Sequence, residues 1–142
     1  MTNQKPSIAC PFLRRLAAII YDCLLLTAVL FIATAILMPF AGGNAIESGN
    51  LVYNIFLIFI SYLYFCWHWV RGGQTLGMRS WHIFVITESI QKPNWKQATL
   101  RFFSAILSLL LLGLGFVWSL FDKNKLALHD RLSKTRLIVK KP

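Results

Sequence analysis

The chain has 142 residues, which is room for one domain, and 56% of them are hydrophobic, above the roughly 45–50% usual in soluble domains. Its formal net charge is +10, but the lysines and arginines gather between and after long apolar stretches that carry almost no charge. This arrangement is typical of a membrane protein with basic cytoplasmic segments, and it argues against a nucleic-acid partner.

Residues 1–11 are polar, so we expect an N-terminal tail without regular structure, followed by a single membrane domain over residues 12–142. The cysteines are too scattered for a disulfide framework or a metal site, and no two histidines stand four residues apart. No nucleophile signature of the Ser-His-Asp or Cys-His kind is recognisable. We therefore expect no metal, no cofactor and no enzymatic activity.

The first apolar run covers about residues 16–38, and at about 1.5 Å per residue a helix of that length more than crosses a bilayer core of about 30 Å. Pro39 ends it. The next loop, residues 39–50, contains no lysine or arginine. By the positive-inside rule this loop lies outside, and the N-terminus lies in the cytoplasm.

A second span is expected over about residues 51–70. Its far end carries two tryptophans and a histidine, residues 67–69, and is followed at once by Arg71. Aromatic side chains next to a basic residue are typical of a membrane interface, here the cytoplasmic one.

The third apolar run, residues 102–121, is long enough to cross a membrane. If it crossed, the seven lysines and arginines of the tail that follows it would lie outside, against the positive-inside rule. If it does not cross, every lysine and arginine of the chain lies inside. Gly113-Leu114-Gly115 at its middle permits a turn, so we predict a broken, re-entrant or interfacial segment. Three full spans remain the alternative.

Two short stretches have strand character: His82–Thr87, rich in β-branched and aromatic residues, and Arg136–Lys140. Because a lone strand is unstable in water, we expect them to pair on one side of the membrane. The predicted fold is an all-α membrane protein with two transmembrane helices, a broken third apolar helix and a small cytoplasmic two-stranded element.

One acidic residue, Asp22, stands inside the first span. Arg15 lies seven residues before it, nearly two helical turns, so the two side chains share a face about 10 Å apart along the axis. A carboxylate at membrane depth costs about 2.5–3.5 kcal/mol on insertion scales, so Asp22 must face protein or water.

Two roles for Asp22 follow. It is a candidate proton or cation site, with Asn54, Thr27 and Ser61 as candidate neighbouring oxygens. The alternative is a structural ion pair with Arg15 or a cytoplasmic arginine, which would fix how the first span packs without further chemistry.

Three stretches, in order, resemble the RDD family of small bacterial membrane proteins, which is named for one arginine and two aspartates. They are Arg15-x-x-Ala18-x-x-x-Asp22, the Gly-Gly-Gln-Thr-Leu-Gly-Met-Arg stretch at 72–79, and the segment from Leu120-Phe121-Asp122 to Leu-His-Asp-Arg-Leu-Ser-Lys-Thr at 128–135. By position the resemblance makes Arg15 the arginine, Asp22 the first aspartate and Asp130 the second, with Asp122 as the other candidate. It implies a bacterial inner-membrane location and a transport activity, with cation–proton exchange suggested for some members.

Two further residues are candidate supports of this charge cluster. His129, beside Asp130, titrates near neutral pH in its ordinary state. Gln74 lies in a glycine-rich turn that lacks the Gly-Lys-Ser/Thr ending of a phosphate-binding loop, so we expect it to cap a neighbouring segment.

Two functions are compatible with the sequence. The first is an oligomeric transporter of ions or small solutes that uses Arg15, Asp22 and Asp130, since two spans cannot enclose a pathway alone. The second is a non-transporting scaffold or accessory subunit in which these residues only hold the fold. In either case we expect anionic lipid headgroups, and a second copy or a membrane partner, as the chain's partners.

Overall fold

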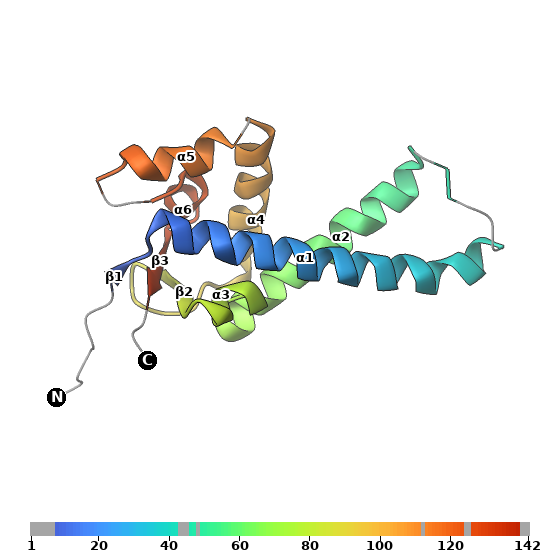
Figure 1. Cartoon of the computed structure of the whole chain (residues 1–142), viewed down its shortest axis with the longest axis horizontal. Helices are drawn as coiled ribbons and strands as arrows, with labels where there is room; N and C mark the ends of the chain where they lie inside the picture. Colours follow the sequence, from blue (N-terminus) through green and yellow to red (C-terminus); the bar gives the residue numbers. More distant parts are fainter. Residues whose placement is uncertain (1–7, 43–45, 48, 112, 124–125, 140–142) are drawn as a thin grey trace.

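The computed structural model describes residues 8–42, 46–47, 49–111, 113–123 and 126–139 (Figure 1). Two long helices, α1 (Phe12–Leu37) and α2 (Leu51–Gly72), extend from one end of the molecule, and the shorter elements gather at the other. Both long helices are apolar and long enough to cross a membrane. The two predicted spans are therefore confirmed as helices.

The outer half of this helix pair exposes large apolar side chains to its surroundings. Phe31 and Ile32 of α1 and Val52 of α2 are each more than half exposed. Near this end the Thr34 and Tyr53 hydroxyls form a hydrogen bond of 2.8 Å that joins the two helices. A short 3-10 helix, η1 (Met38–Ala41), follows α1. Such a surface is suited to lipid or to another membrane helix.

The sheet lies at the opposite end and has three antiparallel strands in the order β1-β3-β2. β2 (Ile83–Thr87) pairs with β3 (Thr135–Val139) along its whole length, which confirms the strand pairing expected from the sequence. β1 (Ile8–Ala9) adds to the other edge of β3. Its two residues fall in the stretch expected to lack regular structure, because so short a strand has no pattern of its own and forms only against a preformed edge.

The third apolar run is broken, as the sequence predicted. α4 (Trp95–Leu110) begins with a capping box between Asn94 and Gln97, and it ends just before a turn at Gly113, where the backbone has a φ of 74°. α5 (Leu114–Phe121) follows. Figure 1 shows α4 running crosswise to α1, and α5 turning back toward the end of the molecule that carries the sheet. The break between α4 and α5 and the change of direction there disagree with the alternative of three full spans.

A compact core joins the start of α1 and the end of α2 to the shorter elements. α3 (Leu76–Ser80) packs on α1, while α6 (Leu128–Leu132) packs on α4 and leads into β3. The buried apolar side chains of this core come from the residue pair before α1, from α1 to α4, and from β2 and β3: Cys10, Ala18, Cys66, Trp69, Met78, Ile83, Val85, Ala98, Phe102, Leu137 and Val139. The segments after the second span are therefore fixed firmly against the first.

Candidate functional site

Two buried polar clusters line one face of α1. The buried residues of this helix are Arg15, Ala18 and Asp22, spaced so that they share a face. Asp22 lies at the centre of one cluster, and Arg15 belongs to the other, which is built around Asp130. Arg15 and Asp22, which the sequence suggested as partners, thus serve two different clusters.

The Asp22 cluster consists of one carboxylate and three neutral donors. Asp22 is buried, and its Oδ1 accepts hydrogen bonds from the Gly77 backbone N–H at 2.9 Å and the Tyr64 hydroxyl at 3.2 Å. Its Oδ2 accepts a hydrogen bond from the Thr75 hydroxyl. The donors come from α2 and from the turn that begins α3, so Asp22 joins all three helices.

Local sequence explains how α3 reaches Asp22. Thr75 is the N-cap of α3, and its hydroxyl oxygen accepts a hydrogen bond from the Met78 N–H at 3.2 Å. Gly77 then lies against α1 so closely that a Cβ there would come within 2.4 Å of the Ala18 carbonyl oxygen. Only glycine permits this approach, which is what brings its N–H to the carboxylate.

A pocket of about 250 Å³ opens beside the Asp22 cluster, at the end of α2. Its lining residues are Trp67, His68, Arg71, Gly72, Gln74, Thr75, Leu76 and Arg79. Thr75 therefore belongs both to the pocket wall and to the hydrogen bonds of Asp22.

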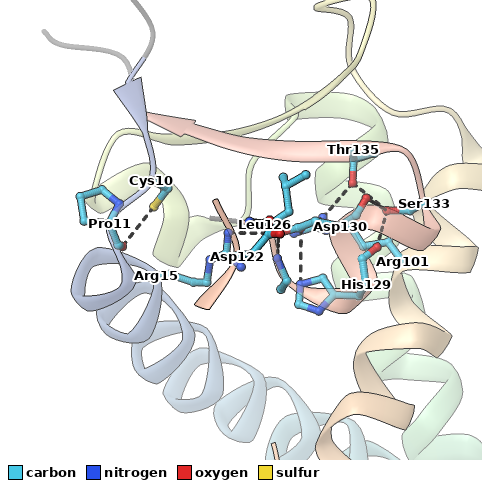
Figure 2. Close-up of polar contacts among 11 residues, drawn as sticks. Cys10, Pro11, Arg15, Arg101, Asp122, Leu126, His129, Asp130, Ser133 and Thr135 are labelled. Atoms are coloured by element: carbon cyan, nitrogen blue, oxygen red, sulfur yellow. Dashed lines mark hydrogen bonds and ion pairs between the residues drawn. The ribbon is translucent and has the colours of Figure 1, made fainter. Parts of the chain in front are cut away.

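The Asp130 cluster is an ionic network (Figure 2). The Asp130 side chain is fully buried, with Arg15 Nη2 at 3.0 Å from its Oδ2 and an Arg101 guanidinium nitrogen bonded to its Oδ1. His129 Nε2 lies 3.6 Å from Oδ1. The Ala127 N–H also donates to Oδ2, at 3.0 Å. One carboxylate thus joins α1, α4 and α6.

Arg101 extends this network to the sheet. Its guanidinium donates to the Thr135 hydroxyl at 2.8 Å, and that hydroxyl is hydrogen-bonded to Ser133 at 2.7 Å (Figure 2). The same guanidinium lies over the Trp69 ring, 5.1 Å from the ring centre, in a cation–π contact. Arg101 therefore connects α2, α4, α6 and β3.

The charges of this cluster follow from its burial and neighbours. Burial alone would raise the pKa of Asp130, but attraction by the positive charge of Arg101, with His129 and Arg15 contributing less, lowers it to about 2. Burial and then repulsion by Arg101 lower the pKa of His129 to about 3. At neutral pH the cluster therefore holds two guanidinium groups, one carboxylate and a neutral imidazole, with an excess of positive charge.

The remaining candidates from the sequence lie apart from Asp22. Asp122, whose side chain is 7% exposed, pairs with the half-exposed Arg131 at 2.5 Å and accepts a hydrogen bond from the Leu126 N–H. Asn54 is exposed toward the outer end of α2. Gln74 donates to the Ile83 carbonyl at 3.3 Å. Among the described residues the ion pairs of aspartates belong to Asp130 and Asp122, and the groups hydrogen-bonded to Asp22 are neutral.

Three important residues escaped the sequence reasoning: Arg101, Tyr64 and Thr75. Arg101 stands immediately before the third apolar run and passes for an interfacial cation, yet its side chain is 2% exposed. Tyr64 could have been found by pairing the two spans as antiparallel helices, which sets it level with Asp22. Thr75 has the sequence signature of an N-cap, since it precedes a short helix.

Residues 9–134 match the RDD family, a span that includes Arg15, Asp22, Arg101 and Asp130. No curated protein and no solved structure matches the chain.

Proposed function

The chain belongs to the RDD family of membrane proteins, and from that premise we propose that it is a subunit of an inner-membrane transporter in which Asp22 takes up and releases a proton. One observation carries the proposal: the buried Asp22 carboxylate, within an apolar helix, accepts its hydrogen bonds from the neutral groups of Tyr64, Thr75 and Gly77. Its charge is solvated by these groups but not cancelled by them.

The division of the charged residues supports this role. The Asp130 carboxylate, between Arg15 and Arg101, has its charge more than balanced, which suits a purely structural part. Asp22, in contrast, is costly as an anion at membrane depth, and taking up a proton or a cation would relieve that cost. Ionisable residues of this kind inside membranes commonly mark ion and proton pathways.

The pocket behind Thr75 favours a proton over a metal cation. Arg71 and Arg79 line it, so a hydrated metal cation would meet positive charge at the entrance. A proton can instead be passed through water in the pocket and the Thr75 hydroxyl to the carboxylate.

The two spans need a second copy of the chain, or a membrane partner, to enclose a pathway. The exposed apolar faces of α1 and α2 are the natural contact surfaces. By the positive-inside rule we place the sheet and the basic segments in the cytoplasm, and the loop between the two spans outside. Anionic headgroups would then meet the basic cytoplasmic face.

The test is proton flux into liposomes that contain the purified protein and a pH-sensitive dye. We expect Asp22→Asn to reduce flux at least tenfold, while its size-exclusion profile and melting temperature stay close to those of the parent. Asp122→Asn is the matched control, since it removes a carboxylate that is paired with the half-exposed Arg131 and lies outside the Asp22 cluster, and it should keep full flux. Equal flux from Asp22→Asn and the parent, or no flux from the parent, would contradict the proposal.

A scaffold role is the second candidate, and the close contact of Gly77 with Ala18 favours it. In that case Asp22 only holds α3 against α1. Asp22→Asn would then lower the melting temperature strongly, and any loss of flux would follow the loss of folded protein. Measuring both quantities on the same sample separates the two functions.

A further inference from the structure

A cavity of about 630 Å³ opens beside the Asp130 cluster, with Asp130 and Thr135 in its wall. Its wall is formed by β3, by the turn before it, and by residues near the end of α5. The lining residues are Ala9, Glu88, Lys123, Leu126, Asp130, Arg131, Lys134, Thr135, Arg136, Leu137 and Ile138. Nothing in the proposed proton site uses this cavity.

Positive charge dominates the cavity wall. Its cations are Lys123, Arg131, Lys134 and Arg136, of which Arg131 is paired with Asp122, and its acids are Glu88 and Asp130. Asp130 is already bonded to Arg15 and Arg101, so it contributes little negative charge to the cavity. The excess positive charge of that buried cluster lies directly behind the wall, and low-dielectric surroundings strengthen its field in the cavity.

One of these cations, Lys134, has an unfavourable backbone conformation. Lys134 occupies the turn between α6 and β3 with a φ of 51°, in the left-handed region where glycine or asparagine is usual. Its N–H donates to the Arg131 carbonyl at 3.2 Å, which closes the turn. A lysine in place of the usual glycine or asparagine is consistent with a role for its positive charge at this position.

We propose that this cavity binds an organic phosphate. Arginine and lysine are the side chains that best match phosphate oxygens, and Lys134 and Arg136 of this wall are both exposed. The volume is in the range of small-molecule sites, which leaves room for an organic group attached to the phosphate. The same chemistry is offered by the headgroup of an anionic phospholipid and by a soluble phosphate ester.

The experiment measures binding to the full-length protein in a neutral detergent at constant ionic strength. The two probes are glycerol 3-phosphate and short-chain phosphatidylglycerol, with sodium chloride and short-chain phosphatidylcholine as their respective blanks. We expect at least one probe to bind saturably. Binding of glycerol 3-phosphate identifies a soluble ester as a ligand, and binding of phosphatidylglycerol alone identifies a lipid headgroup. Absence of saturable binding by both overturns the proposal.

The site is tested with the double variant Lys134→Gln/Arg136→Gln, which should weaken binding at least tenfold. The control Arg14→Gln/Lys96→Gln removes the same charge from exposed positions outside the cavity and should bind like the parent. An equal loss in both variants would overturn the proposal, since it would mean unspecific attraction by net charge. Asp22→Asn should bind the probes normally, so failure of the proton site leaves this result unaffected.

A measurement on the unmodified protein covers the case in which the double variant does not fold. Saturating probe should protect the Lys134 amine from acylation, with Lys96 as the internal reference. Equal acylation of Lys134 with and without the probe would overturn the proposal.

Discussion

Arg15 at the start of the first span and Asp130 near the end of the chain form a buried ion pair, with Arg15 Nη2 at 3.0 Å from Asp130 Oδ2. Arg101 binds the other oxygen of the same carboxylate. This network and the sheet, in which β1 and β2 both pair with β3, join the N-terminal and C-terminal parts of the chain. The stability and topology of the protein can be tested at these contacts.

Removing the Asp130 charge should destabilise the protein strongly. Asp130→Asn leaves Arg15 and Arg101 buried next to each other without their shared carboxylate, and breaking a buried pair in this way costs about 3–5 kcal/mol. The loss is measured as a lower melting temperature in detergent. Asp122→Asn is the control, because its partner Arg131 is half exposed and can turn to water, so the change should cost much less than Asp130→Asn. Similar losses in both variants would contradict the prediction.

Adding one methyl group at Gly77 should separate α3 from α1. In Gly77→Ala the new Cβ would meet the Ala18 carbonyl oxygen at 2.4 Å and Asp22 Cγ at 2.8 Å, so the backbone must move, at a cost of about 1–3 kcal/mol. Gly72→Ala is the matched control, since nothing lies within 4 Å of a Cβ at that helical position. It should be neutral or slightly stabilising. The melting temperatures of both variants test this prediction. An unchanged melting temperature for Gly77→Ala would show that the contact between α3 and α1 is not tight.

Acid should destabilise the protein first through His129. Its pKa is about 3 in the folded protein against an ordinary value of 6.5, so below pH 6.5 the unfolded chain binds a proton that the folded one does not. The free energy of unfolding should therefore fall as the pH drops from 6.5 toward 3, by up to about 1.4 kcal/mol per pH unit. Asp130, with a pKa lowered from 3.8 to about 2, adds a further loss only below about pH 4.

Melting temperatures measured at about ten pH values between pH 8 and pH 4 test whether His129 causes this loss of stability. His129→Gln should flatten the curve between pH 6.5 and 4, because a neutral side chain cannot take up the proton. His82→Asn serves as the control, since His82 is exposed and asparagine tolerates its positive φ. Its curve should keep the slope of the parent, and a parent curve that is already flat would refute the prediction.

Both ends of the chain should lie on the same side of the membrane. β1 precedes the first span, β2 follows the second, and both pair with β3, so the chain between β2 and β3 can make no net crossing. A reporter after residue 142 and a reporter before residue 1 should give the same side in intact cells. A cysteine introduced in Glu47→Cys should be labelled from the opposite side. Termini on opposite sides would be incompatible with the sheet.

The sequence by itself determined the apolar spans, the break in the third run, the pairing of β2 with β3 and the shared helical face of Arg15 and Asp22, whereas Asp130 was identified by the resemblance to the RDD family. These features depend on periodicity, composition and short-range turn chemistry, which are visible in a linear chain. The break at Gly113, for example, follows from a glycine in the middle of an apolar run.

Tertiary structure alone decided which charged groups meet. Arg15 and Asp22 share a face of α1, but Arg101 arrives from α4 and, with Arg15, holds Asp130, while Tyr64, Thr75 and Gly77 take Asp22. Helical spacing predicts only the direction in which a side chain points. Its partner depends on how α3, α4 and α6 pack against α1, and that is set by the fit of the whole core, including the space left by the missing side chain of Gly77.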